Sequence, residues 1–233
     1  MRIIPGRTGK IDVEVRGRAS DSVAIDQAGD LVSVRQEQGH FLRGSLEVTF
    51  SVPSGTGVVA SLASADLDVD TPLEDLNVSA ASGDLRVGEV RRELLAKTAS
   101  GDIEIDAIEG KGKLIAASGD IRIRTVRGDS TINTASGDID IDEAHGDLVL
   151  RSASGDITVD RYLGSDIVAS TASGDTVVRI PPGRSVDVDL RSLSGNIKLP
   201  SSPGPGQVTG DKIRVRIRFK SVSGDFELAT PDS

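Results

Sequence analysis

Residues 98–121 read TASGDIEIDAIEGKGKLIAASGDI, and this stretch holds two copies of Ser-Gly-Asp that lie 18 residues apart. The triplet recurs at that spacing through the middle of the chain, at residues 82–84, 100–102, 118–120, 136–138 and 154–156. A degenerate Ser-Ala-Asp lies one period earlier, at 64–66, and related triplets follow at wider spacings, at 173–175, 194–196 and 223–225. A short fixed period is typical of repeats in which each unit packs mainly on its neighbours. The sequence therefore predicts a stack of 18-residue units.

Each unit contains two segments with the alternation of a half-buried strand. Counted from the glycine of the triplet as position 0, the residues at +2 and +4 are aliphatic in every regular unit. Positions +11 and +13 form a second, mostly apolar segment. This pattern predicts strands near +1 to +5 and +10 to +15, one turn at +5 to +9 and another at Ala-Ser-Gly. Thr176 stands where an aliphatic residue is expected at +2, which predicts a distorted coil there.

Position +3 of successive units alternates in charge, through Asp68, Arg86, Glu104, Arg122 and Asp140. If units stack in parallel register, these side chains lie about 4.8 Å apart from row to row, and opposite neighbours attract. The alternation supports the stack independently of the triplet. We therefore expect an all-β fold: a single parallel β-solenoid (β-helix) of about 18-residue coils, with two strands per coil and irregular β-rich ends.

The chain is expected to form one continuous domain with distinct ends. Residues 1–60 are interpreted as N-terminal strands and irregular first coils, 61–199 as the regular solenoid, 200–210 as a Pro/Gly loop, and 211–233 as C-terminal strands or a cap. Large rings outside the regular middle are expected to plug the open ends. These rings are Phe41, Phe50, Phe219 and Phe226, whereas Tyr162 lies within the middle.

Composition excludes several classes of protein. The formal net charge is −9, which argues against general nucleic-acid binding. There is no cysteine, so disulfides, thiolate metal sites and a cysteine nucleophile are excluded. The N-terminus shows no signal-peptide core and no segment has the length of a membrane helix. We expect a soluble cytoplasmic protein.

The aspartates at position +1 would form a ladder along the stack, and stacked carboxylates repel. One interpretation is that each carboxylate accepts hydrogen bonds from backbone N–H groups of the turn. The other is a row of calcium ions held between carboxylate and hydroxyl or carbonyl oxygens. Calcium is the only cofactor that the sequence suggests. The ladder residues are Asp66, Asp84, Asp102, Asp120, Asp138, Asp156 and Asp175.

A basic strand is expected near the C-terminus, where cations alternate with Ile213, Val215, Ile217 and Phe219. A terminal strand with charged side chains resists edge-to-edge aggregation. There are two alternatives. The cations could pair with acidic neighbours in the same chain, or they could bind an anionic partner such as a lipid surface or an acidic polymer. The cations are Lys212, Arg214, Arg216, Arg218 and Lys220.

Other candidate features are weaker. Leu95, Ile115, Val149 and Val168 are expected to point outward, where they could form a lateral face for self-association. The two histidines, His40 and His145, lie in unrelated contexts, so a serine nucleophile has no obvious base. No phosphate-binding loop, zinc-ligand spacing or dinucleotide fingerprint is present. We therefore expect no catalytic residues and no enzymatic activity.

The repeat Ala-Ser-Gly-Asp-Ile-x-Ile resembles that of the bacterial "putative adhesin" β-solenoid family, a domain family of unknown function. Three further segments carry the resemblance, namely Val52-Pro53-Ser54-Gly55, Ile180-Pro181-Pro182-Gly183 and residues 222–228, VSGDFEL. The resemblance covers residues 10–230 and implies the solenoid fold. It also implies relatives that are exported or membrane-anchored, and it supplies no functional residues.

Four functions are compatible with these observations. The leading one is a non-enzymatic scaffold or adhesin-like binding module that presents a repetitive charged surface to a macromolecular partner. A self-assembling solenoid of the filament type and a calcium-binding repeat protein are alternatives. A polysaccharide-active β-helix enzyme is the fourth, and the chain's 2% of aromatic residues argues against it.

Overall fold

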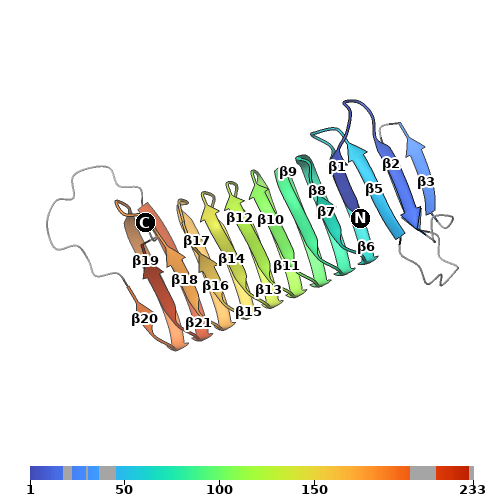
Figure 1. Ribbon diagram of the computed structural model, residues 1–233. Helices are drawn as coiled ribbons and strands as arrows, with labels where there is room; N and C mark the ends of the chain where they lie inside the picture. Colours follow the sequence, from blue (N-terminus) through green and yellow to red (C-terminus); the bar gives the residue numbers. More distant parts are fainter. Residues whose placement is uncertain (18–22, 30, 37–45, 200–213, 231–233) are drawn as a thin grey trace.

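The computed structural model describes residues 1–17, 23–29, 31–36, 46–199 and 214–230. These residues form an elongated stack of β-strands, with the N-terminal strands at one end and β19 to β22 at the other (Figure 1). Twenty of the strands join into one sheet that winds around the stack, and two more form a separate pair. The described part of the chain contains no helix long and apolar enough to cross a membrane.

The stack has two faces, which we call the first face (positions +2 to +7) and the second face (positions +10 to +17). In stacking order the first face consists of β2 (Asp12–Gly17), β5 (Leu46–Val52), β1 (Arg2–Pro5), β7 (Leu67–Val69), the first half of β9 (Leu85–Ser100), β10 (Ile103–Ile108), β12 (Ile121–Val126), β14 (Ile139–Ala144), β16 (Ile157–Val159), β18 (Thr176–Arg179), β22 (Phe226–Ala229) and β20 (Ile197–Lys198). The second face consists of β6 (Gly57–Ser64), β8 (Leu73–Ser82), the second half of β9, β11 (Lys111–Ser118), β13 (Ser130–Ser136), β15 (Leu148–Ser154), β17 (Asp166–Ser173), β21 (Arg214–Ser223) and β19 (Ser185–Ser194).

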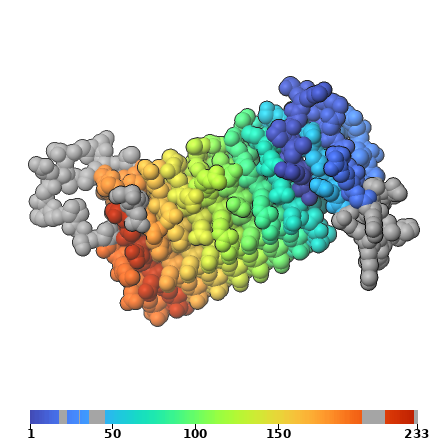
Figure 2. Space-filling model, in the orientation of Figure 1, coloured from blue at the N-terminus to red at the C-terminus, as the bar shows by residue number. Residues whose placement is uncertain are grey.

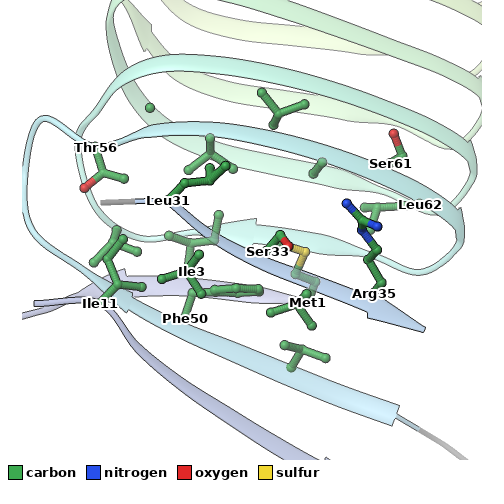
Figure 3. A pocket seen from close by; sticks show the side chains of 18 residues that line it. Met1, Ile3, Ile11, Leu31, Ser33, Arg35, Phe50, Thr56, Ser61 and Leu62 are labelled. Atoms are coloured by element: carbon green, nitrogen blue, oxygen red, sulfur yellow. The ribbon is translucent and has the colours of Figure 1, made fainter. Parts of the chain in front are cut away.

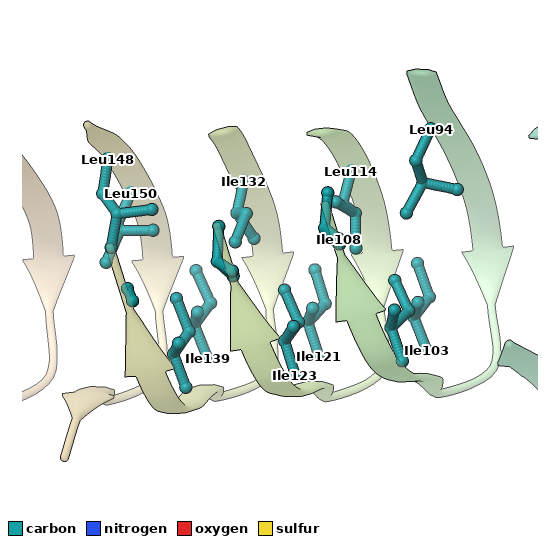
Figure 4. Packing of buried hydrophobic residues seen from close by; sticks show 14 of the residues in the cluster. Leu94, Ile103, Ile108, Leu114, Ile121, Ile123, Ile132, Ile139, Leu148 and Leu150 are labelled. Atoms are coloured by element: carbon teal, nitrogen blue, oxygen red, sulfur yellow. The ribbon is translucent and has the colours of Figure 1, made fainter. Parts of the chain in front are cut away.

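The predicted parallel, in-register stack is confirmed. Ile103 pairs with Leu85 on one side and Ile121 on the other, which are its equivalents one period away. Equivalent side chains therefore become neighbours, and the core consists of columns of aliphatic residues (Figure 4). Ile103, Ile121 and Ile139 form one such column, and each is at most 1% exposed. A core only two sheets thick suits these branched side chains, which pack well on pleated surfaces.

In the coils of β10, β12 and β14 the first strand is longer than predicted. It continues to position +7, where Ile108, Val126 and Ala144 are fully buried. Tyr162 is buried at the same position, three residues after the end of β16, and forms an isolated bridge with Ala144. The expected turn at +5 to +9 is therefore wrong for its first half. The strand bends after +4, so that the next inward side chain follows three residues later rather than two. A period of two could not reveal this position.

The C-terminal rows do not follow chain order. From β18 the chain passes through Ile180-Pro181-Pro182-Gly183 to β19, which lies one row farther out than a regular coil would place it. The vacant row is filled by β21, which pairs with β17 and β19, and by β22, which pairs with β18 and β20. The last described strands are thus inserted inside the stack, and β19 and β20 form its outermost row (Figure 1).

The predicted distortion at Thr176 is wrong. Thr176 keeps the register of its column, because it pairs with Ile157 on one side and Phe226 on the other, and it is fully buried. The irregularity lies after the strand, where the chain skips a row. The expectation for the phenylalanines holds only in part. Phe219 and Phe226 pack with ring centroids 4.8 Å apart in the row beneath the outermost one.

The N-terminal end contains a similar insertion. β1 lies between β5 and β7, so the first strand of the chain is also held inside the stack. β2 then pairs antiparallel with β5, and β3 (Val23–Ala28) and β4 (Leu31–Gln36) form the separate antiparallel pair. Phe50 packs half-buried against the core. The 200–210 loop, His40 and Phe41 lie outside the described residues.

Candidate functional site

The aspartate ladder runs along one corner of the stack as a chain of hydrogen bonds. The backbone N–H of each rung donates to the Oδ1 atom of the preceding one, for example Asp120 to Asp102 at 2.9 Å. The ladder crosses the inserted row without a break, because Asp225 donates to Asp175 at 2.8 Å and Asn196 to Asp225 at 2.7 Å. The same bond joins Asp84 to Asp66, Asp102 to Asp84, Asp138 to Asp120, Asp156 to Asp138 and Asp175 to Asp156.

These bonds explain how stacked carboxylates are tolerated. A carboxylate that accepts an N–H bond is stabilised in its charged form. At Asp225 the backbone N–H and the side-chain amide of Asn196 lower the carboxyl pKa below its ordinary value. Arginines add positive charge beside the ladder, with Arg122 at 2.8 Å from Asp120 and Arg86 at 3.5 Å from Asp84. This geometry agrees with the interpretation in which each carboxylate accepts a hydrogen bond from a backbone N–H group of a turn.

We expect calcium to change the thermal stability of this protein little, because Oδ1 of each bonded rung is already occupied by an N–H donor. Calcium takes six to eight oxygen ligands, and competing for these atoms would break turn hydrogen bonds. Calorimetric melting with and without calcium measures the effect, with magnesium as the control for general ionic screening. A large rise in melting temperature specific to calcium would show that the ladder is a metal site.

A second ladder, which sequence reasoning missed, runs along the opposite corner. The N–H of Asp147 donates to Oδ1 of Asp129 at 3.0 Å, and the N–H of Asp166 donates to Oδ1 of Asp147 at the same distance. Gly128 precedes Asp129, and Gly146 precedes Asp147. The backbone of the row beneath lies too close to each of these glycines to leave room for a Cβ atom. The signal was the dipeptide Gly-Asp at 128–129 and 146–147, one period apart.

The alternating charges on the first face lie next to one another as predicted. Arg86 lies 4.0 Å from Asp68 in one neighbouring row and 3.7 Å from Glu104 in the other. Arg122 similarly lies 3.8 Å from Asp140. All these side chains are exposed, so each pair adds little stability by itself. The charges of this face are therefore largely engaged with one another.

The basic strand is an interior row, so its interpretation as a terminal strand is wrong. Arg218 donates to both carboxylate oxygens of Asp166 at 2.9 and 3.0 Å, and Arg216 lies 3.9 Å from the same carboxylate. On the other side β19 places Asp187 beside Arg216 and Asp189 beside Arg218. Pairing with acidic neighbours of the same chain therefore explains these two cations.

The remaining residues of the basic strand are placed differently. Lys220 lies between Ser170 and Arg191, and Arg214 lies beside Ser185. Lys212 is outside the described residues. The sequence did contain a signal for the acidic neighbours, since Asp187 and Asp189 alternate with valines at the same spacing as the arginines.

The predicted outward aliphatic residues do not form a continuous apolar face. Ile115 lies between Lys97 and Asn133, and Leu95 lies beside Lys113. Only Val149 and Val168 are direct neighbours. All four predicted residues lie half-buried on the second face, among polar side chains.

A cavity of about 390 Å³ lies at the N-terminal end (Figure 3). Its wall is mainly apolar and comes from β1, β4, β5 and β6, with Ile3, Leu31, Phe50 and Leu62 among the lining residues. Arg35 and Ser33 of β4 add polar groups. No pattern in the sequence marks this cavity, because its walls come from segments with unrelated spacing.

Tyr162 is the only Phe, Tyr or Trp residue within residues 61–199, and we expect its hydroxyl to affect stability at alkaline pH. The hydroxyl is fully buried and donates to the Asp166 carbonyl at 2.7 Å. Burial, and then the charges of Asp147 and Asp166, raise the pKa of this phenol above its ordinary value. The contribution of the neutral Tyr162 side chain to folding stability is therefore complete below the ordinary phenol pKa of about 10, and it is lost as the pH rises further.

The Tyr162→Phe variant tests this expectation. It should be less stable at neutral pH by about 1 kcal/mol, because a buried carbonyl loses its donor. Above pH 10 the gap to the wild type should narrow, because the variant has no phenol to ionise. The chain has one tyrosine and no tryptophan, so phenolate absorbance during unfolding reports this residue alone. An unchanged gap would contradict the account.

Comparisons with known proteins give one match. A family model described as Toastrack DUF4097, a domain of unknown function, matches residues 1–228. Neither the curated proteins nor the solved structures yielded a match. The family's description names no adhesive activity, so the adhesin label implied by the resemblance is not confirmed, whereas the β-solenoid is. Because the match covers nearly the whole chain, the chain belongs to the Toastrack (DUF4097) family.

Proposed function

We propose that this protein is a non-enzymatic scaffold that binds a macromolecular partner on the second face of the stack. The observation that carries the proposal is a cluster of lysines on the second face that have no ion-pair partner in the described part of the chain. On the first face opposite charges pair from row to row, as Arg86 does with Asp68 and Glu104. The second face also carries an ion pair, between Arg218 and Asp166. The lysines at 97, 111 and 113, however, have no carboxylate within ion-pair distance among the described residues, although Glu93 stands opposite Lys111 in the register.

These lysines and their aliphatic neighbours define a patch, which we call the lysine patch: Leu95, Lys97, Lys111, Lys113 and Ile115. The five residues come from two adjacent strands, β9 and β11, so they form one continuous area. Figure 2 shows the rows of the stack following one another along the length of the molecule. A positive, partly apolar area on a chain with a net charge of −9 suits an acidic protein segment as partner.

The buried groups of the stack support a non-catalytic role. Among the described residues, the buried polar side chains besides Tyr162 are serines and threonines, and all of them except Thr71 lie in strands. Catalytic acids and bases generally have environments that shift their pKa by burial together with a specific partner in a cleft. Here the lowered pKa of Asp75 has a simple surface cause, its hydrogen bond with Arg92.

A pair of matched variants tests the proposal. The Lys97→Glu, Lys113→Glu protein reverses two charges of the lysine patch, and the Arg124→Glu, Arg161→Glu protein reverses two on the first face, with the same change in net charge. We expect chemical cross-linking in a cell extract to join one partner to the wild type and to the first-face variant, but not to the patch variant. Equal capture by all three proteins, or no capture by any of them, would refute this function.

A further inference from the structure

The C-terminal end of the stack leaves the core open. The inward residues of β19, Val186, Val188 and Leu190, are only half-buried, although their neighbours one row inward are fully buried. On the same two rows Leu193 and Val222, which lie side by side at the corner, are 85% and 55% exposed. In the part of the chain that the structure describes, β19 pairs with β21 alone, so its other edge presents unpaired backbone groups. Such an edge readily accepts another strand.

The outward side chains of β19 indicate which strand fits. They read Asp187, Asp189 and Arg191, and Arg191 Nε lies 3.4 Å from Asp189 Oδ1 in its own chain. We propose that β19 pairs antiparallel with β19 of a second copy, so that two stacks meet end to end about a two-fold axis through Leu190. Each Asp189 then faces Arg191 of the second copy, and the four charges alternate in sign around the axis. This inference concerns assembly and does not depend on the proposed binding face.

Register follows from the same charges. With Leu190 opposite Leu190, both Asp189–Arg191 contacts form, and Asp187 lies diagonal to Arg191 of the second copy. A shift that placed Asp189 opposite Asp189 would bring like charges together, which is destabilising in a directly opposed pair. The favoured register also brings Leu190 and Val188 of both copies over the two open cores, so that each end covers the other. A closed two-fold contact uses the same surface twice and stops at two copies.

The other end of the stack does not fit a head-to-tail contact. There β1, β5 and β2 continue the first face beyond β7, whereas β6 is the one strand of the described ranges that continues the second face beyond β8. The two faces therefore end at different heights, and β4 lines the cavity beside β6. A flat row such as β19 and β20 could not pair with both faces of such an end. The geometry favours a dimer over a filament.

Charge reversal tests the contact in solution. Sedimentation and light scattering should show a wild-type equilibrium between monomer and dimer that shifts to monomer as salt is added. Arg191→Glu should weaken the dimer by about tenfold or more, because two attractive pairs become repulsive. The double variant D189R/R191D exchanges the charges and should restore dimerisation. Circular dichroism confirms that each variant is folded.

Disulfide trapping tests the register. The chain has no cysteine, so L190C introduces one thiol, which the two-fold axis places beside its equivalent. Oxidation should give a covalent dimer of L190C. The matched control is V188C, whose thiols would lie about 13 Å apart across the axis and should stay unlinked. A wild type that stays monomeric at every concentration, filaments, a D189R/R191D protein that does not recover, or equal cross-linking of L190C and V188C would each overturn the proposal.

Discussion

Alanine in place of Gly119 should destabilise the protein by about 3 kcal/mol or more, a loss large enough to disrupt the middle of the stack. Gly119 has φ of +129°, a conformation that L side chains rarely adopt. In addition, a Cβ atom there would meet the carbonyl oxygen of Gly101 in the adjacent row, far inside 3.0 Å. The backbone of the next row cannot move away without breaking the ladder between Asp102 and Asp120.

Two other glycines separate the causes of this loss. Gly183 also has a positive φ, of +90°, but a Cβ atom there meets nothing within 4 Å. Gly183→Ala should therefore show only the conformational part, about 1–3 kcal/mol. Gly57 has an ordinary φ and its added Cβ would lie 3.8 Å from the Asp75 Cβ, so Gly57→Ala should be close to neutral. Urea unfolding gives the three values, and equal stability of the Gly119 and Gly57 variants would refute the close approach of rows.

Phe219→Ala should cost about 3–5 kcal/mol, the usual range for removing a buried ring. Phe219 is fully buried between Ala169 of β17 and Leu190 of β19, and it packs on Phe226. Leu190 occupies the same column one row farther out and is only half-buried. Leu190→Ala should consequently cost much less than 3 kcal/mol when it is measured in dilute, monomeric protein.

This comparison depends on the inserted row. If rows followed chain order, Phe219 would lie in the last row and Leu190 beneath it, and the ranking of the two variants would be reversed. Denaturant unfolding of both variants under the same conditions decides between the two arrangements. Ala169→Gly, in the row beneath both, checks that a substitution at a neighbouring core position also lowers the free energy of unfolding.

The regular middle of the fold was predictable because its period is visible residue by residue. Ile103, Ile121 and Ile139 occupy equivalent positions, and parallel stacking turns equivalence in sequence into contact in space. The charge order of Asp68, Arg86 and Glu104 supported the same register. The buried position at +7 was not predicted, because the strand bends before it. A bend changes the sequence period at which inward-facing residues recur.

The ends were less predictable, for a different physical reason. The triplets at 174, 195 and 224 lie 21 and 29 residues apart, which signals extra chain between rows. Spacing alone cannot specify the row in which a strand lies, since β21 could stack on β17 or on β19 by pattern alone. In the structure β21 lies between these two strands, and its arginines face Asp166 on one side and Asp187 and Asp189 on the other.

The candidate sites show the same division. The aspartate ladder was readable from the repeat, and its hydrogen bonds follow from the turn geometry. The lysine patch could not be predicted from the repeat, because it depends on which side chains are neighbours across rows. The open end of β19 could not be predicted either, because it depends on which row lies outermost. The N-terminal cavity depends on the placement of β4, which no repeat describes.

Distances between spin labels test the stacking order most directly. Arg86, Glu227 and Lys198 belong to one outward column of the first face, and the chain has no cysteine to interfere with labelling. Adjacent strands lie about 4.8 Å apart, so the structure predicts about 29 Å between labels at R86C and E227C and about 34 Å between labels at R86C and K198C. Double electron–electron resonance, with labelled protein diluted in unlabelled protein, measures both distances. If position 198 proved closer to position 86 than position 227 is, or if both distances differed widely from these values, the stacked and inserted rows would be contradicted.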